Sequence, residues 1–271
     1  MTSTIEVRPR IEAPALGEVK QMWLKGFTKP SSRSLQAKLG PSEVGSCAYC
    51  VGYTMAAKLA PDLPDRDPDP FGYAAHIGTM CHYYLEHKLD LVYGAGYEIE
   101  TFRETKLKDI FEVPGYGKVS GNCDLMVPDW CRTFDYKFPG SWSYDKVQMA
   151  IAKGRNALKQ GKEVTHAHKP SMQYRVQQQI YAQGWIQAGY QVDSCVIIFL
   201  PRHTNSVSDV IFWEEPVNPE LYQAAIANVG IIWEYVKDGE LDLLESDKDC
   251  YTCGDRGPGR GNLTTYLQAT T

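Results

Sequence analysis

The sequence lacks any long apolar run, any internal repeat and any low-complexity segment. Its longest apolar stretch lies at residues 195–200, far shorter than the roughly 20 residues that a membrane-spanning helix needs. Residues 1–7 show neither the basic region nor the apolar core of a secretory signal. We therefore expect no membrane association and a cytoplasmic location, where cysteines stay reduced or bind metal.

Positive charge is also scarce over the chain as a whole. The 271 residues carry 28 basic and 33 acidic side chains, a net charge of −5, which argues against nucleic-acid binding through bulk charge. The length and the hydrophobic share of 43% fit one soluble domain, or a domain with an appended subdomain. A function that needs positive charge therefore depends on a local basic surface.

Basic residues do gather in two segments. Residues 19–42 hold five basic residues and no acidic one, with Trp23 and Phe27 among them; the N-terminal segment 1–41 is either a solvated tail or a surface that follows a phosphate backbone. Residues 141–170 hold six basic and two acidic residues, and form either a solvated helix face or an arm that grips a charged substrate. The candidate substrate-binding cations of this arm are Lys153, Arg155 and Lys159.

Chemically reactive groups concentrate between residues 121 and 137. Two short strands are expected, at 123–127 and 132–137, joined by a turn. Asp135 and Lys137 are two residues apart and share one face of their strand, and Asp124 lies on the neighbouring strand. Two carboxylates and an ammonium at a sheet edge suit a divalent cation with a bound water. Alone, Asp135 and Lys137 would fit an exposed ion pair better than a metal site, because charged pairs at this spacing occur by chance on many strand ends.

Four of the eight cysteines form two Cys-x-x-Cys pairs near opposite ends of the chain. Cys47 and Cys50 follow Ser42, the expected N-cap of a helix that presents both thiols on one face. That pair alone would also fit two small buried side chains. Cys250 and Cys253 lie in a polar, Gly-rich setting, which favours a shared four-thiolate metal site that clamps the two ends together.

Two expected helices carry further polar groups. In the helix at 73–91, His82 and Glu86 are four residues apart and face the same way, and Gly78 allows another backbone to approach closely. In the helix at 170–188, residues Gln173, Gln177 and Tyr181 repeat every four positions. This polar stripe is either a solvated face or one wall of a cleft that donates hydrogen bonds to a phosphate.

The remaining elements follow from local patterns. Period-two alternation predicts strands at 97–107, 110–113 and 118–120, a mostly antiparallel meander that leads into the 123–137 pair. Further strands are expected at 194–200 and 207–213. A helix begins at Asn218-Pro219 and stops at Gly239. The tail, 256–271, starts Gly-rich and is expected to be flexible.

The order of these motifs resembles the RecB-like branch of the PD-(D/E)XK nucleases over roughly residues 42–200 and the C-terminal cysteines. The matching residues are Gly78, Thr79 and His82, then Gly121 and Asp124, then Asp135 and Lys137, then Gln177 and Tyr181. Within that branch, cysteines at both ends resemble the iron–sulfur exonucleases associated with CRISPR loci and bacterial recombination. Two features depart from the family. The cysteines divide two and two instead of one and three, and Asp135 stands where many members have Glu.

The resemblance implies an α/β fold, with a mixed four- or five-stranded sheet flanked by helices. This PD-(D/E)XK restriction-endonuclease-like core, residues 42–255, would carry a cysteine-clamped helical subdomain. It also implies that His82, Asp124, Asp135 and the carbonyl of Tyr136 bind Mg²⁺ or Mn²⁺. Lys137 would orient or deprotonate a water, and Gln177 and Tyr181 would hold the scissile phosphate. Cys47, Cys50, Cys250 and Cys253 would hold a [4Fe-4S] cluster or, alternatively, Zn²⁺.

The implied activity is that of a metal-dependent DNA exonuclease in recombination, repair or replication, including that of a virus or mobile element. Its partner would be DNA, single-stranded or with free ends, and a homo-oligomer or a recombination-protein partner is consistent with the family. Two alternatives remain open at this point. One is a catalytically inactive DNA-binding or scaffold protein, and the other is a CRISPR-adaptation factor that trims DNA.

Overall fold

A computed structural model describes residues 39–61, 73–93, 97–246 and 250. Most of the basic N-terminal segment 1–41, with Trp23 and Phe27, lies outside the described residues, as do Cys253 and the tail 256–271. The domain boundaries expected at residues 41 and 255 therefore stay predictions. In the part that is described, no helix is long and apolar enough to cross a membrane.

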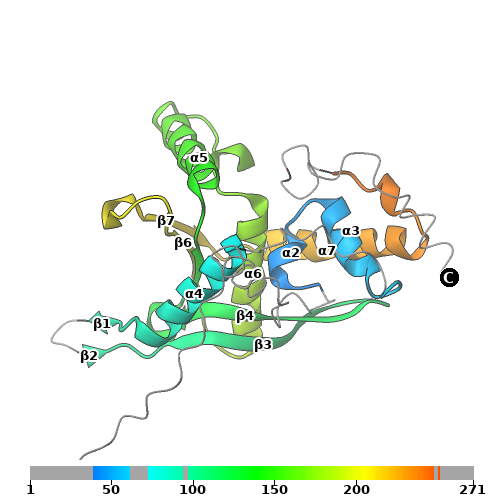
Figure 1. Ribbon diagram of the computed structural model, residues 1–271, viewed down its shortest axis with the longest axis horizontal. Helices are drawn as coiled ribbons and strands as arrows, with labels where there is room; N and C mark the ends of the chain where they lie inside the picture. Colours follow the sequence, from blue (N-terminus) through cyan, green and yellow to red (C-terminus); the bar gives the residue numbers. More distant parts are fainter. Residues whose placement is uncertain (1–38, 62–72, 94–96, 247–249, 251–271) are drawn as a thin grey trace, which may run out of the picture.

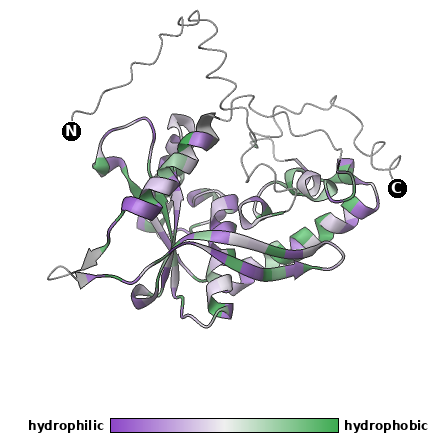
Figure 2. Ribbon diagram, turned by 60° about the horizontal axis from the view of Figure 1, so that its bottom comes forward, coloured by the Kyte–Doolittle hydropathy of each residue, from purple (hydrophilic) through white to green (hydrophobic). Residues whose placement is uncertain are grey.

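The centre of the fold is a five-stranded sheet with the order β3-β4-β5-β6-β7. The strands are β3 (Phe102–Val113), β4 (Gly117–Val127), β5 (Arg132–Lys137), β6 (Ser194–Phe199) and β7 (Ile211–Pro216). The pairs β3–β4, β4–β5 and β6–β7 are antiparallel, and β5–β6 is parallel. Hydrophobic and hydrophilic residues alternate along the long β3–β4 hairpin (Figure 2), as expected for strands with one covered face.

Helices flank this sheet (Figure 1). They are α2 (Pro41–Val44), α3 (Ala48–Ala56), α4 (Tyr73–Lys88), α5 (Ser141–Lys159), α6 (Met172–Gln187) and α7 (Pro219–Lys237). A two-stranded sheet of β1 (Val92–Tyr93) and β2 (Tyr97–Glu98) follows α4, and four short 3-10 turns occur at Pro128–Trp130, His166–His168, Val207–Asp209 and Leu241–Leu243. The expected fold class, a mixed α/β sheet flanked by helices, is confirmed.

Helix α6 is the central helix, because both its sides are covered. Val176, Ile180 and Trp185 belong to the largest core cluster, which joins α6 to α2, α3, α7 and the β3–β4 hairpin. A second cluster, with Phe134 and Tyr136 of β5, packs against α4. Gln177 and Tyr181 of the predicted polar stripe are buried, as are Gln178 and Gln179, and Gln173 is partly buried, so the stripe is not a solvated face.

Local interactions explain three differences from the sequence-based expectations. Ser42 is not a helix cap: α2 begins after Gly40, whose N–H donates to Oε2 of Glu43 at 2.6 Å. Two helices replace the single one that was expected: α2 ends at Val44, with Gly45 as its C-cap, and α3 begins after Cys47. Strand β7 begins at Ile211, since residues 207–209 form a 3-10 turn capped by the side chain of Ser206.

The close packing of α2 against α6 requires glycine at position 45. A Cβ added to Gly45 would lie 2.6 Å from Cα of Gln173 and 3.0 Å from the carbonyl oxygen of Met172. Both are backbone atoms of the neighbouring helix region, so they have little freedom to move aside. The short helix that leads to the first cysteine pair is thereby held on the core.

Gly45→Ala is expected to lower the free energy of unfolding by about 1–3 kcal/mol, since backbone must shift to accommodate the methyl group. Gly230→Ala is the matched control, because nothing lies within 4 Å of its added Cβ and it sits inside α7. There alanine is expected to stabilise by about 0.5–1 kcal/mol through helix propensity. Urea denaturation of the two variants measures both values, and a Gly45→Ala protein as stable as wild type would contradict the close contact.

Candidate functional site

The candidate site lies where β4 and β5 separate. Their ladder ends at the pair Leu125–Phe134, one residue before Asp124 and Asp135. Beyond that pair, Oδ2 of Asp124 accepts a hydrogen bond from the backbone N–H of Tyr136 at 2.7 Å. A side-chain carboxylate thus replaces the backbone acceptor of a regular ladder, and the two aspartates lie in the gap between the strands.

Helix α4 brings an imidazole to this gap. Nδ1 of His82 lies 3.6 Å from Oδ2 of Asp124 and 3.2 Å from Oε1 of Glu104 on β3. One ligand atom of each of these three residues lies within 4.8 Å of the other two. The rings of Tyr136 and Phe138 contact His82 edge-on and hold it in this position.

Asp135 and Lys137 occupy the sheet side of the same gap. Asp135 is fully buried, and its Oδ2 lies 2.7 Å from Nζ of Lys137. Nζ also donates to Oε1 of Gln177 at 2.9 Å, and the Gln177 amide donates to the Tyr181 hydroxyl at 3.4 Å. The predicted residues therefore form two neighbouring groups. His82 and Asp124 lie with Glu104, whereas Asp135 lies with Lys137, Gln177 and Tyr181. The groups are joined by Tyr136, whose N–H donates to Asp124, and the charge of Asp135 acts on both His82 and Asp124.

Burial and neighbouring charges shift the pKa values of Asp124 and His82. Burial, followed by the nearby charge of Asp135, raises the pKa of Asp124 to about 7, although His82 and Lys137 act in the opposite direction. For His82, burial is the largest single effect and lowers the pKa. The Glu104 hydrogen bond and the Asp124 carboxylate outweigh burial, so the net pKa of His82 is raised. The carboxylates Asp135, Asp124 and Glu104 thus contribute to both shifts, and a bound cation would offset their negative charge.

The metal-free protein is expected to become less stable as the pH rises from about 4 to 7. The folded state keeps a proton on Asp124 up to about pH 7, whereas the unfolded chain loses it near 3.8. The folded state therefore binds more protons in that window, and the free energy of unfolding falls with pH, by on the order of a few kcal/mol. The raised pKa of His82 acts in the same direction, because its contribution is also lost as the pH rises.

Urea denaturation in EDTA at a series of pH values measures this dependence. Asp124→Asn is expected to reduce the fall in the free energy of unfolding with pH, because it removes the carboxyl whose pKa is raised to about 7. A wild-type protein in EDTA that gains stability between pH 4 and 7 would contradict the charge balance described above.

The donor set fits a divalent metal ion. Carboxylate oxygens are preferred ligands of Mg²⁺, and an imidazole is acceptable to Mn²⁺. Among the described residues, Oδ1 of Asp135 has no hydrogen-bond partner although its side chain is fully buried. A buried carboxylate oxygen without a donor is costly unless a cation completes it.

Glu104 is the site residue that sequence reasoning missed. Counted back from the Val113–Gly117 pair, the hairpin would place Lys106 opposite Asp124. The irregularity between Leu107 and Phe111 shifts the register by two residues, so Glu104 stands there instead. Glu104 itself has a positive φ of 41°, an uncommon conformation for a residue other than glycine and one that often marks functional sites.

Glu104→Gln is expected to weaken Mn²⁺ binding by about tenfold, because the side chain keeps its size but loses its charge. Titration of the protein with Mn²⁺, followed by electron paramagnetic resonance, measures the affinity. Glu112→Gln is the control, since this exposed carboxylate of the same strand lies away from His82. Unchanged Mn²⁺ affinity in Glu104→Gln would remove Glu104 from the site.

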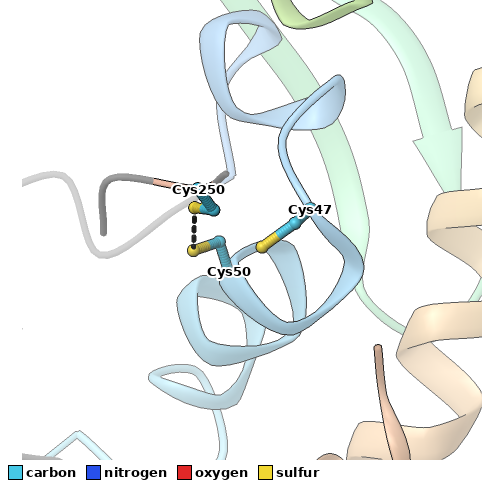
Figure 3. Close-up of side chains that lie close together, drawn as sticks. All are labelled: Cys47, Cys50 and Cys250. Atoms are coloured by element: carbon cyan, nitrogen blue, oxygen red, sulfur yellow. Dashed lines mark hydrogen bonds between the residues drawn. The ribbon is translucent and has the colours of Figure 1, made fainter. Parts of the chain in front are cut away.

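Cysteines from both ends of the described chain meet in a second cluster (Figure 3). Cys47 precedes α3, Cys50 is buried in its first turn, and Cys250 approaches from the C-terminal segment. Sγ of Cys50 lies 3.6 Å from Sγ of Cys250, and one sulfur of each residue lies within 4.8 Å of the others. This distance exceeds the roughly 2.05 Å of a disulfide bond.

Comparison with known proteins assigns no family. No family model matches the sequence, and no curated protein matches it significantly. Among solved structures, the chain is similar to an alkaline exonuclease, LHK-Exo, from Laribacter hongkongensis, and to LHK-Exo in complex with dAMP. Each shares 13% sequence identity at a TM-score of 0.40, over 82% of this chain and 94% of the other. A likeness of this degree does not transfer the activity of those proteins to this chain.

Other residues singled out in the sequence lie outside the group formed by His82, Glu104 and Asp124. Nothing among the described residues lies within 4 Å of a Cβ added to Gly78, so this glycine is not needed for a close approach. The Glu86 carboxylate pairs with His87 at 3.4 Å. Gly121 is required by packing, since its Cβ would lie 2.6 Å from the Pro41 ring. The candidate DNA-binding residues Lys153, Arg155 and Lys159 are exposed on α5.

Proposed function

We propose that this chain is a metal-dependent deoxyribonuclease that hydrolyses phosphodiester bonds, of the RecB-like PD-(D/E)XK type. One observation carries the proposal: His82, Asp124, Asp135 and Lys137 come from three separate elements and converge in the gap between β4 and β5. An isolated Asp-x-Lys pair would be an ordinary ion pair. A buried group of carboxylates with an imidazole and an ammonium is what cation-assisted hydrolysis of an anionic substrate requires.

The metal ion, held by His82, Asp124, Asp135 and the carbonyl of Tyr136, would stabilise charge on the scissile phosphate and lower the pKa of a water. Glu104 would add a further carboxylate to that ligand set.

Lys137 is positioned to act on the water or the phosphate. An ammonium has three N–H donors. Two of the three on Lys137 face Asp135 and Gln177, at 2.7 and 2.9 Å. The ammonium also lies 5.3 Å from the centroid of the Tyr174 ring, and its third donor would orient the attacking water and offset the charge that develops on the phosphate. Tyr181, in contact with Gln177, steadies this arrangement.

The substrate would be DNA, single-stranded or with free ends, and cleavage would proceed as an exonuclease in recombination, repair or replication. The exposed cations of α5, Lys153, Arg155 and Lys159, supply the local positive charge that the net charge of −5 does not.

The cysteine cluster would hold a [4Fe-4S] cluster or Zn²⁺ and serve a structural role. An inactive DNA-binding scaffold would have no need of the buried, unpartnered carboxylate oxygen of Asp135.

Digestion of end-labelled single- and double-stranded DNA with Mg²⁺, Mn²⁺ or EDTA tests the proposal. We expect release of short products from the ends with either metal and none in EDTA. Intact DNA in every lane, with binding retained, would instead favour the inactive scaffold. Capture of other proteins together with trimmed DNA from the source cell would favour the CRISPR-adaptation role.

A further inference from the structure

Helix α5 (Ser141–Lys159) carries a stripe of alternating apolar and basic residues that faces solvent. Trp142, Lys146, Met149 and Lys153 follow one another at helical spacings of four, three and four residues, so they lie along one side. Trp142 is 58% exposed and Met149 54%, and both lysines are exposed. Within the described part of the chain, Trp142 and Met149 belong to none of the core clusters, so both leave apolar surface open to a partner.

The opposite side of α5 anchors the helix. Val147 and Ile151 pack on Ile197 and Phe199 of β6, and the Tyr144 hydroxyl donates to the carbonyl of Asp209 at 2.5 Å. The helix is therefore fixed in place, and Figure 1 shows it projecting beyond the other elements. The stripe is a rigid surface, which keeps the entropy cost of binding small.

The stripe begins beside the metal centre. Ser141, the first residue of α5, follows Lys137 by four residues along the chain, a length that spans at most about 14 Å. Along the stripe, Nζ of Lys146 lies 3.7 Å from the centroid of the Trp142 ring. The ammonium covers one face of the indole, and a ring has a second face on which a planar group can stack.

We propose that this stripe binds unpaired, single-stranded DNA on its way to the metal centre. Bases stack on Trp142 and Met149, and phosphates contact Lys146 and Lys153. The inference rests on the proposed nuclease function and specifies the form of the substrate. Stacking platforms interleaved with cations are typical of single-strand binding, whereas a duplex hides its base faces and offers phosphates and the base edges in its grooves.

The arrangement of the stripe also distinguishes DNA from a membrane surface. A helix that lies in a membrane segregates its lysines from its apolar residues. Here the lysines and the apolar residues alternate on the same side. Arg155 stands two positions from Lys153, on another side of the helix, so it contributes charge without taking part in stacking.

Binding of a fluorescein-labelled single-stranded oligonucleotide and of the matching duplex, measured by anisotropy in EDTA, tests the proposal. Trp142→Ala is expected to weaken single-strand binding about tenfold and duplex binding by less than twofold. Phe212→Ala is the aromatic control, because Phe212 is 66% exposed on β7 and outside the stripe, and it is expected to leave both affinities unchanged. Lys153→Ala is expected to affect the single strand more than Arg155→Ala does, although each removes one charge.

Hydrolysis of bis-p-nitrophenyl phosphate with Mn²⁺ separates this inference from the proposed function. This small diester needs no stripe, so Trp142→Ala is expected to cleave it at the wild-type rate. If neither protein cleaves it or DNA, the nuclease proposal fails. If wild type cleaves it but Trp142→Ala binds single strands normally, or if Trp142→Ala reduces binding to anionic vesicles and not to oligonucleotides, the stripe proposal fails.

Discussion

Asp135→Asn is expected to abolish metal-dependent DNA cleavage while the metal-free protein stays folded. Asp135 is fully buried beside Asp124 and pairs with Lys137 at 2.7 Å. An amide keeps the shape of the side chain but removes the charge that would hold the cation, so activity is expected to fall by more than about 10³-fold. Removing one of two neighbouring buried carboxylates also relieves their repulsion, which offsets the loss of the ion pair.

Two measurements on the same variant separate catalysis from folding. Digestion of end-labelled DNA gives the rate, and thermal unfolding with and without Mn²⁺ gives the metal response. In wild type, Mn²⁺ is expected to raise the Tm, because the ion binds only the folded state. In Asp135→Asn this rise is expected to disappear. Asp129→Asn, which alters an exposed carboxylate at the other end of β5, is expected to behave as wild type. Normal cleavage by Asp135→Asn would exclude this site.

The sequence is sufficient to place the Asp124, Asp135 and Lys137 cluster, because it depends only on short-range patterns. Apolar and β-forming residues on either side of the turn at Pro128 define both strands, and the structure has β5 at the expected residues, 132–137. The helix that carries His82 is likewise a local pattern. What brings it beside Asp124 is packing of α4 on the sheet, which the sequence indicated only through the resemblance to a family.

Features that depend on contacts between distant parts of the chain could not be predicted from local sequence patterns. The position of Glu104 depends on an irregularity in the β3–β4 ladder, which no turn signal encodes. Gln177, Gln178 and Gln179 appear to a sequence reader as residues for solvent, yet all three are buried. Each finds a partner on another element: Lys137, Thr133 and the backbone of Asn218, respectively. Burial of polar side chains follows from tertiary contacts, not from the composition of their own helix.

Cys50→Ser is expected to remove the metal or cluster from the cysteine site and to release the C-terminal segment. Cys50 is buried, its Sγ lies 3.6 Å from that of Cys250, and Tyr49 N–H donates to the carbonyl of Glu245 at 3.1 Å. A metal there would connect chain segments 200 residues apart. Structural zinc contributes about 10–16 kcal/mol in small zinc domains, so the free energy of unfolding is expected to drop by several kcal/mol.

The colour and metal content of the purified protein distinguish an iron–sulfur cluster from zinc at the cysteine site. An iron–sulfur cluster gives a brown protein with absorption near roughly 400 nm, and zinc gives a colourless one. The 3.6 Å between the two sulfurs is close to the roughly 3.8 Å expected for two thiolates on one tetrahedral ion with bonds of about 2.3 Å.

In either case Cys50→Ser is expected to lose the bound metal, whereas Cys131→Ser, which alters the turn between β4 and β5, keeps it. Elemental analysis of both variants, prepared without oxygen, decides the question. Retention of metal by Cys50→Ser at the wild-type ratio would show that the four cysteines do not share a site. Such a result would leave the nuclease site intact, since none of its residues is a cysteine.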